Sequence, residues 1–189
     1  AQLVAAALEC FREQGVAATA VSDIVKRAGV AQGTFYLYFD TKDDLICALV
    51  ERALDRLVER VEEAAGTPGA TAVEKLLVFR DAFVELADEP HEQEALRVLH
   101  QPHNREVHDR VTAAFVPRLT PVVERIVSQG IEEGSFDVCD ALTGSLFVLG
   151  SFAAVESTLG GTSDLERLIP EVTRYTLRGL GYRGDIASV

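Results

Sequence analysis

Residues 32–42, with the sequence QGTFYLYFDTK, place an amide, two aliphatic hydroxyls, two phenols and an ammonium group in one short segment. Hydroxyl groups, cations and helix N-termini commonly bind phosphate, and glutamine can pair with adenine in the major groove. Phe35 and Phe39 are four residues apart, so on a helix they share one face and are expected in a core. Tyr36 and Tyr38 fall on other faces. The segment is therefore predicted to be half core and half contact surface.

The overall charge argues against a generic nucleic-acid binder. The formal net charge of the 189 residues is −12, and binding to a polyphosphate is largely electrostatic. The charge is unevenly distributed, however: Lys26 and Arg27 are the only charged residues between Asp23 and Asp40, while acidic residues crowd later segments. The opening segment therefore differs from the rest of the chain.

Helical spacing of apolar residues appears almost everywhere, and no segment alternates with a period of two for long. About nine helices and an all-α fold are expected. The first four cover about 4–14, 21–28, 32–38 and 42–65, and the others lie within 71–86, 90–102, 104–134, 137–159 and 163–181. Three pairs resemble capping boxes, namely Thr41 with Asp44, Thr71 with Glu74, and Ser163 with Glu166.

Three short helices within the first 40 residues, two of them joined by the link GVAQ, predict a helix-turn-helix domain. Gly29 permits the left-handed backbone that a sharp turn needs. Ile24 and Val25 are expected to face a small core with Leu8, Phe11, Phe35 and Phe39. Residues 1–45 are assigned to this domain, and a long helix over about 42–65 links it to residues 46–189.

The segment GVAATAVSDIVKRAGVAQGTFYLYFDTKDDL, residues 15–45, resembles the DNA-binding signature of TetR-type (tetracycline-repressor-like) transcriptional regulators. The resemblance implies a homodimer whose third helices lie in successive major grooves about 34–36 Å apart. It also implies a palindromic double-stranded operator, and a C-terminal domain, residues 46–189, that binds an effector and dimerises. The function expected is a repressor released from its operator by a small hydrophobic molecule.

Carried over residue by residue, the resemblance implies that Thr19 contacts phosphate near the start of the second helix. Gln32, Gly33 and Thr34 begin the recognition helix, nearest the bases. The resemblance further implies that Tyr36 and Tyr38 touch the DNA backbone, together with Lys42, which follows the helix. The chain departs from the family pattern at Ala20 and Ala31, where the family often has hydroxyl residues. The basic arm that often precedes the first helix in the family is absent from this numbering, and it is expected in residues before position 1.

The effector and dimer surfaces are assigned from the expected helices alone. Residues of the middle helices are predicted to surround an apolar cavity. They are Phe79, Phe83, Leu99, His100, Val107, Val111, Phe115 and Phe147. Each of them would suit an ordinary hydrophobic core equally well. Small residues on the helix near 141–159, together with the last helix, predict a four-helix dimer core. Its residues are Ser145, Val148, Phe152, Leu168, Val172 and Tyr175; a fully internal helix is the alternative.

Two other classes of function are weighed. One is a regulator-like fold without DNA binding that carries a ligand or a protein partner, favoured by Ala20, Ala31 and the acidic balance. The other is an all-helical enzyme, but the chain has no nucleophile elbow, no HExxH and no phosphate loop. His91, His100, His103 and His108 are irregularly spaced, so no metal or other cofactor is expected.

The compartment expected is a reducing cytoplasm. Cys10, Cys47 and Cys139 are far apart and odd in number, which does not suit a disulfide framework. No basic signal-peptide region opens the chain. The longest uncharged run, residues 141–155, is shorter than the about 20 apolar residues of a membrane span and is predicted to be a helix buried in protein.

Overall fold

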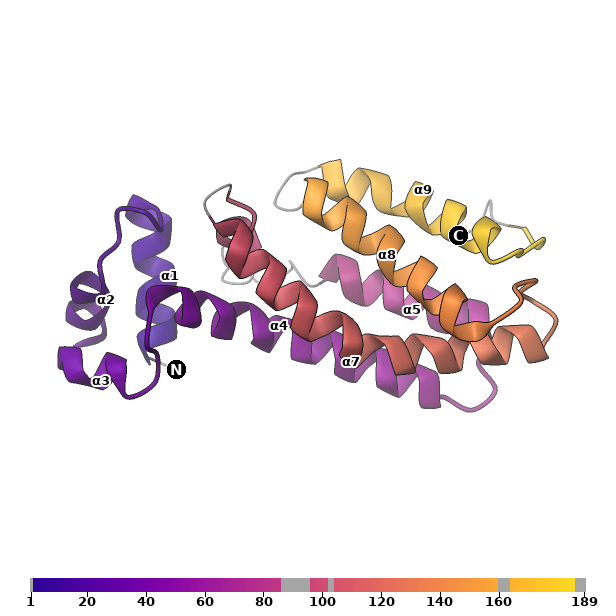
Figure 1. Ribbon diagram of the computed structural model, residues 1–189, viewed down its shortest axis with the longest axis horizontal. Helices are drawn as coiled ribbons and strands as arrows, with labels where there is room; N and C mark the ends of the chain where they lie inside the picture. Colours follow the sequence, from indigo (N-terminus) through magenta and orange to yellow (C-terminus); the bar gives the residue numbers. More distant parts are fainter. Residues whose placement is uncertain (1, 86–95, 102–103, 160–163, 186–189) are drawn as a thin grey trace. The chain divides into compact units, whose positions relative to one another are not determined.

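The computed structural model describes residues 2–85, 96–101, 104–159 and 164–185, and these form helices and no strand (Figure 1). The prediction of an all-α fold is confirmed. The chain divides into two compact units. Unit 1 comprises Ala1–Ala53 and Ala87–Val111, and unit 2 comprises Leu54–Leu86 and Thr112–Val189.

Unit 1 begins with α1 (Gln2–Gln14), α2 (Val21–Ala28) and α3 (Gln32–Tyr36), followed by the first half of α4 (Lys42–Gly66). The start and end of α2 match the expected bounds, and α3 ends two residues early. Gly29 ends α2 with φ of 68°, the left-handed conformation that residues with a Cβ adopt only at a cost. The chain can therefore turn sharply between α2 and α3.

The core of unit 1 is the one expected from apolar spacing. Ile24 and Phe35 are fully buried, and Phe11 is 1% exposed. The rings of Phe35 and Phe39 lie 5.5 Å apart, although Phe39 remains half-buried. Residues 96–99 of unit 1 are also helical, within the segment 90–102 where a short helix was expected.

Unit 2 contains the second half of α4, α5 (Ala72–Val84), most of α7 (Arg105–Glu132), α8 (Ala141–Leu159) and α9 (Asp164–Gly179). α8 and α9 lie side by side in Figure 1 and pack against each other. The expected stop after α7 is present at Gly134, whose φ is 72°. The capping box expected from Ser163 and Glu166 at the start of α9 lies outside what the structure describes, because Ser163 and the Glu166 side chain are not among the described parts.

A buried polar network fixes the loop between α4 and α5. The Lys75 ammonium, 6% exposed, donates to the Ala65 carbonyl and to Gln129 Oε1, both at 2.8 Å. Gln129 in turn donates to the Ala70 carbonyl at 2.8 Å. Because a buried ammonium is costly unless its donors are satisfied, this network links the loop to α7 in one arrangement.

The expectation that residues 141–155 form a helix buried in protein is wrong for the protomer. By length and composition alone α8 could cross a membrane, and only 28% of its apolar window Ala141–Thr158 is buried. Leu142, Leu146 and Phe147 are 44%, 49% and 47% exposed. The internal alternative is therefore excluded, and α8 offers an apolar surface.

Candidate nucleic-acid interface

Both helices of the helix-turn-helix begin without a side-chain cap. Ala20 and Ala31 are the N-caps of α2 and α3, and neither side chain can accept a hydrogen bond. Asp23 compensates at α2, where its Oδ2 accepts from the Ala20 amide at 2.9 Å. The N-terminus of α3 has no such carboxylate in its first turn. Its amides therefore meet no negative charge from the helix itself.

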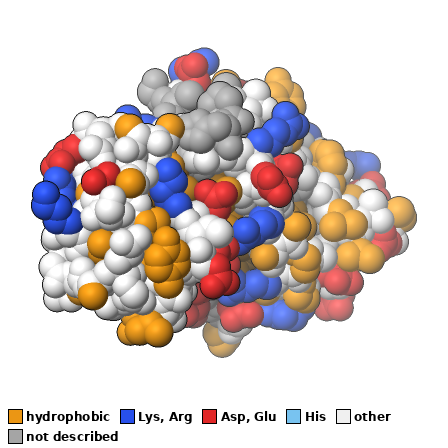
Figure 2. Space-filling model, turned by 60° about the vertical axis from the view of Figure 1, so that its left-hand side comes forward, with side chains coloured by type: hydrophobic (Ala, Val, Ile, Leu, Met, Phe, Trp, Pro, Cys, Tyr) orange, Lys and Arg blue, Asp and Glu red, His pale blue; other side chains and the backbone are white. Residues whose placement is uncertain are grey.

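The segment that carries α3 presents its polar side chains to solvent over an aromatic core. Gln32 and Gly33 are exposed, and Tyr36 and Tyr38 are 51% and 71% exposed. The Tyr36 ring meets the buried Phe35 ring edge to face, with centroids 5.4 Å apart. Figure 2, in which this end of the chain is turned forward, shows orange side chains emerging there from a largely uncharged white surface.

Leu37 belongs to the same surface and was missed by sequence reasoning. It is 79% exposed, between the two tyrosines. Its signal was its position, because a residue between two outward-facing neighbours at the end of a short helix has no core to enter. An exposed aliphatic side chain at this place can meet sugar or a thymine methyl group.

The structure differs from the sequence interpretation at Thr19. Its side chain is buried, at 2% exposure, and its hydroxyl donates to the Gly15 carbonyl at 2.7 Å. The same oxygen accepts from Gln14 Nε2 at 3.3 Å. Thr19 thus stabilises the turn between α1 and α2, and its hydroxyl does not lie on the exposed surface. Thr34, by contrast, is half-buried at the start of α3.

Lys42 also has internal partners. Its ammonium donates to the Val16 carbonyl at 2.6 Å and to the Thr19 carbonyl at 3.1 Å, and the side chain is half-buried. Val16 and Thr19 belong to the turn between α1 and α2. The first turn of α4 is itself fixed by Thr41, whose hydroxyl accepts from the Asp44 amide at 3.1 Å. Lys42 therefore connects α4 to that turn.

The remaining cations of this region differ in their availability. Arg27 forms a two-point ion pair with Glu13, with Nη1 2.6 Å from Oε1, and this pair lowers the pKa of the Glu13 carboxyl. Lys26 is exposed on α2. The sequence interpretation of these two residues as a solvated face agrees with their exposure.

The predicted effector-pocket residues are divided between the two units. Leu99, Val107 and Val111 are buried in unit 1. His100, also in unit 1, is half-buried; its ring lies 5.3 Å from that of His108, and its Nδ1 lies 2.6 Å from the Leu96 carbonyl oxygen. His91 and His103 lie outside the described residues.

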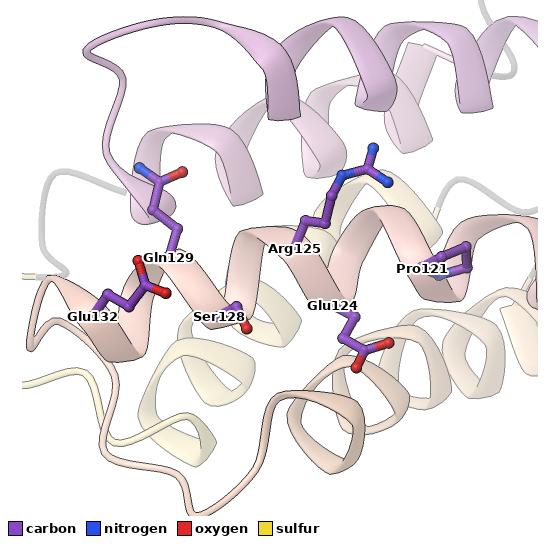
Figure 3. Close-up of a pocket in the computed structure, with 6 residues that line it drawn as sticks. All are labelled: Pro121, Glu124, Arg125, Ser128, Gln129 and Glu132. Atoms are coloured by element: carbon purple, nitrogen blue, oxygen red, sulfur yellow. The ribbon is translucent and has the colours of Figure 1, made fainter.

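In unit 2, Phe79 and Phe83 form an aromatic cluster with Phe152, with ring centroids 5.0–6.4 Å apart. Phe115 is half-buried, whereas Phe147 is 47% exposed. A surface depression of about 300 Å³ runs along α7 and is lined by none of the predicted residues (Figure 3). Its lining is Pro121, Glu124, Arg125, Ser128, Gln129 and Glu132.

The predicted dimer residues have two different environments. Ser145, Val148 and Phe152 are buried within unit 2, so they are absent from the surface of α8. On α9, Leu168 and Val172 are half-buried and Tyr175 is 71% exposed. The apolar surface of α8 consists instead of Leu142, Leu146 and Phe147. Exposed apolar residues thus lie on both helices that were expected to dimerise, but on α8 they occupy another face than the one that carries Ser145, Val148 and Phe152.

Comparisons with known proteins extend these observations. A family model described as bacterial regulatory proteins, tetR family, matches residues 3–49. The fatty acid metabolism regulator protein of Bacillus subtilis (strain 168) is 34% identical over 134 residues, 70% of this chain and 68% of that protein. The HTH-type transcriptional repressor KstR2 of Mycobacterium tuberculosis (strain ATCC 25618 / H37Rv) is 30% identical over 141 residues, 71% and 68% of the two chains.

Solved structures with a similar fold superpose on nearly the whole chain. The transcriptional regulator FadR from Bacillus subtilis, in complex with stearoyl-CoA, superposes with a TM-score of 0.70 and 28% identity, covering 94% of this chain and 97% of that one. SmeT, the repressor of the Stenotrophomonas maltophilia multidrug efflux pump SmeDEF, gives a TM-score of 0.75 at 21% identity, covering 98% and 91%, which shows the fold alone. The resemblance found in residues 15–45 is confirmed.

Proposed function

We propose that this chain, which belongs to the tetR family of bacterial regulatory proteins, is a homodimeric repressor that leaves its operator when it binds a long-chain acyl thioester. The chain is a ligand-responsive, DNA-binding transcriptional regulator, as the sequence predicted. Neither the family nor the relatives favour the alternative of a ligand carrier without DNA binding. The family and the relatives are regulators, not enzymes. The operator geometry, the effector and the dimer are the parts proposed here.

The proposal for DNA binding is carried by one observation, the exposure of two tyrosines over aromatic rings: Tyr36 meets the fully buried Phe35 and Tyr38 meets Phe39. This arrangement supports a role of both hydroxyls at backbone phosphates, because each tyrosine ring packs against a phenylalanine that limits its movement. Gln32 and Gly33, at the exposed start of α3, are proposed to lie nearest the base edges, with Thr34 beside them. Residues 1–45 then form the DNA-binding domain and residues 46–189 the effector and dimer domain.

The effector class is proposed from the relatives. One relative is named a fatty acid metabolism regulator, and the FadR structure from Bacillus subtilis contains stearoyl-CoA. An acyl chain needs an apolar channel with few polar groups. Phe79 and Phe83, with a half-buried ring at Phe83, supply aromatic surface of this kind in unit 2. A long acyl chain is the proposed occupant, and a thioester-linked headgroup the proposed polar end.

The dimer is proposed to form through the apolar faces of α8 and α9. Leu142, Leu146 and Phe147 are exposed on α8, and Tyr175 is exposed on α9. The Phe147 ring lies directly over Gly179, where a Cβ atom would lie 2.3 Å from the ring, so the two helices approach closely. Exposed apolar patches of this kind mark interaction sites. Two copies related by a two-fold axis would cover each other's patch.

A second copy is favoured over a lipid bilayer as the partner of α8. Asp140 accepts from the Leu142 and Thr143 amides, which places an ionised carboxylate at the start of the helix. Ser145 and Val148 on the opposite face are buried in unit 2, so only one side of α8 is available. A cytoplasmic location is proposed on the same grounds, together with the bacterial regulators that the chain resembles.

The effector is proposed to act by population shift. The dimer is proposed to exist in two states, one whose α3 helices are spaced to fit the operator and one whose spacing does not fit. A ligand that binds the second state more tightly lowers operator affinity, and the operator lowers ligand affinity by the same free energy. No contact with DNA needs to be broken directly. Because α4 contributes its first half to unit 1 and its second half to unit 2, it is proposed to transmit the shift.

Selection from random duplex DNA, followed by gel-shift titration of the winning sequence, tests the proposal. We expect a palindromic site and its release by stearoyl-CoA, with acetyl-CoA as the matched control because it shares the headgroup and lacks the chain. The absence of any preferred sequence would reject the DNA-binding function. Equal release by both thioesters, or by neither, would reject the proposed effector class.

A further inference from the structure

The proposed DNA-binding domain, residues 1–45, is itself acidic. It contains six carboxylates and four cations, so its formal net charge is −2. A domain that binds nucleic acid normally carries an excess of positive charge, because contacts with phosphate supply most of its affinity for any duplex. The partners of these carboxylates therefore decide how much negative charge the domain presents to DNA.

Four of the six carboxylates have a described partner within unit 1. Glu9 and Glu13 form ion pairs with Arg27. Asp23 and Asp44 each accept a hydrogen bond from a main-chain amide where a helix begins, both at 2.9 Å. These four carboxylates therefore contribute to the fold of unit 1, and the charge of Arg27 is compensated with them.

The other two carboxylates are those of Asp40 and Asp43. Both residues are exposed, and among the residues that the structure describes neither has a hydrogen bond or an ion pair. Asp43 lies in the first turn of α4, where the helix dipole favours a negative charge. Asp40 precedes the cap residue Thr41 and lies in no helix. The fold of unit 1 therefore accounts for every carboxylate of the domain except that of Asp40.

Asp40 lies between Tyr38 and Lys42, whose polar groups are proposed contacts to the DNA backbone. Tyr38 is 71% exposed. Two of the three N–H donors of Lys42 point to main-chain carbonyls, which leaves one for a phosphate. Because two residues of extended chain span at most about 7 Å, the Asp40 backbone lies within that distance of both neighbours. This is shorter than the Debye length of about 8 Å at physiological salt.

We propose that Asp40 is a repulsive residue of the DNA interface, whose carboxylate lies near the backbone phosphates and weakens binding to every duplex. This inference rests on the proposed DNA-binding function. The phosphates are the same in every sequence, so their repulsion carries no base information. Binding to non-operator DNA depends almost wholly on attraction to phosphate, and Asp40 keeps it weak. The operator complex then depends more strongly on the contacts of Gln32 and the tyrosines.

Three substitutions separate local repulsion from other effects. Asp40→Asn removes the charge and keeps the size of the side chain, whereas Asp40→Glu keeps the charge. Glu59→Gln changes the net charge of the chain equally, at an exposed residue of α4 that belongs to unit 2. Fluorescence anisotropy measures the affinity of the whole chain for the selected operator and for a scrambled duplex of the same length. The thermal midpoint of each variant is recorded alongside.

We expect Asp40→Asn to bind both duplexes at least about threefold more tightly at about 20 mM salt, because one unit charge about 7 Å from a phosphate in water accounts for roughly that factor. The gain should fall below about twofold near 300 mM salt, since the repulsion is then screened. Asp40→Glu and Glu59→Gln should bind as the wild type does. Thermal midpoints should stay close to wild type, because Asp40 has no described partner to lose.

Unchanged affinity of Asp40→Asn at low salt would overturn the proposal, and so would a gain that does not shrink as salt is added. An equal gain in Glu59→Gln would assign the effect to the net charge of the chain. A gain for the operator alone would assign Asp40 to base recognition, and weaker binding would give it a positioning role; each of these also overturns the proposal. Failure of the wild-type chain to prefer any sequence is a different outcome, since it rejects the proposed function and this inference with it.

Discussion

Phe35 and Tyr36 are neighbours in the sequence with opposite environments. The Phe35 side chain is fully buried and the Tyr36 side chain is 51% exposed, because successive residues of a helix point about 100° apart. The buried ring supplies the packing energy that fixes α3. The exposed ring, in edge contact with it at 5.4 Å, receives a defined position without becoming part of the core. One side chain thus stabilises the surface that its neighbour forms.

Replacing the phenols separates these two roles. Tyr36→Phe and Tyr38→Phe should each weaken operator binding by about 1 kcal/mol, roughly fivefold, because each removes the hydroxyl proposed to donate a hydrogen bond to phosphate. Affinity should fall equally for related operator sequences, since phosphate contacts carry no base information. Gel-shift titration against several operators measures this.

Tyr182→Phe, at a half-buried tyrosine beyond the end of α9, is the control and should leave affinity unchanged. Thermal midpoints should stay close to wild type in all three variants. A Tyr36→Phe variant with full affinity would show that its hydroxyl does not touch the DNA backbone.

At the scale of elements, short-range caps determine where the helices begin. Thr41 and Asp44 cap α4 reciprocally, and Thr71 and Glu74 do the same for α5. Asp44 has a second function, because Arg110 of α7 donates to it at 3.0 Å. The Thr41 hydroxyl, and then Arg110, hold the pKa of the Asp44 carboxyl below its usual range. The cap is thus also a link between two helices of unit 1.

The lowered pKa of Asp44 makes the stability of this cap depend on pH. Since the folded-state pKa lies below the unfolded value of about 3.9, the stabilisation is complete above about pH 4 and is lost as the pH falls through the folded pKa. Asp44→Asn should therefore be less stable than wild type at pH 6, and the difference should shrink toward pH 3. Urea unfolding at several pH values measures it.

Asp43→Asn removes a charge from the same turn at an exposed residue and serves as the control for the helix dipole. Its difference from wild type should be smaller than that of Asp44→Asn at pH 6. A destabilisation of Asp44→Asn that stays constant from pH 6 to pH 3 would contradict the assignment of the cap to the ionised carboxylate.

The end of α7 depends on a close approach that only glycine allows. A Cβ atom at Gly130 would lie 2.0 Å from Phe136 Cδ2, and the Gly130 carbonyl accepts from the Ser135 and Phe136 amides. Gly130→Ala should therefore destabilise the fold by roughly 1–3 kcal/mol, because Phe136 must leave its position. Thermal unfolding measures the loss.

Gly66→Ala, at the last residue of α4 where nothing lies within 4 Å of an added Cβ, is the matched control. It should be neutral or slightly stabilising, because alanine favours the helix. Equal effects of the two substitutions would show that helix propensity, not the contact with Phe136, governs Gly130.

At the scale of the whole molecule, the feature that one protomer does not account for is the exposure of an apolar face on α8 and α9. A protein with a net charge of −12 places Leu142, Leu146 and Phe147 on the surface of one helix. Water contact with these side chains is unfavourable by about 25 cal/mol per Å². The face is therefore expected to be covered by its counterpart in a second copy.

Leu146→Glu should convert the proposed dimer to a monomer, because pairing across the two-fold would bury two carboxylates without partners. Light scattering after size exclusion measures the mass. Leu37→Glu makes the same chemical change at a leucine that is 79% exposed in unit 1, and should leave the mass unchanged. A wild-type monomer at micromolar concentration, or a Leu146→Glu dimer, would contradict the assignment of this face.

Local interactions explain why much of the fold could be predicted. Gly29 ends α2 through its own left-handed φ, and Thr71 begins α5 through a hydrogen bond three residues away. The division of residues 32–42 into a buried Phe35 and exposed tyrosines follows from helical spacing. These features depend on neighbours within about one turn, so the sequence contains all the groups involved.

The burial of other residues differs from the sequence interpretation because the groups that decide it lie far away in the sequence. Thr19 is buried beneath a turn that Lys42 holds from 23 residues away. Ser145 and Val148 were assigned to a surface, yet α8 carries small and apolar residues on every side, so its sequence has no polar face to mark which side meets solvent. The predicted pocket residues were chosen by the same apolar character and lie in both units.

The sequence by itself thus determined the all-α class, the helix-turn-helix within residues 1–45 and the aromatic pattern of α3, since hydrogen bonds and spacing within a turn specify them. Only the tertiary structure decided which face of α8 is exposed, and that the Lys42 ammonium binds the carbonyls of Val16 and Thr19. The physical reason is that burial and long-range hydrogen bonds depend on which segments pack together, and an amphipathic pattern that is absent or ambiguous cannot specify that packing.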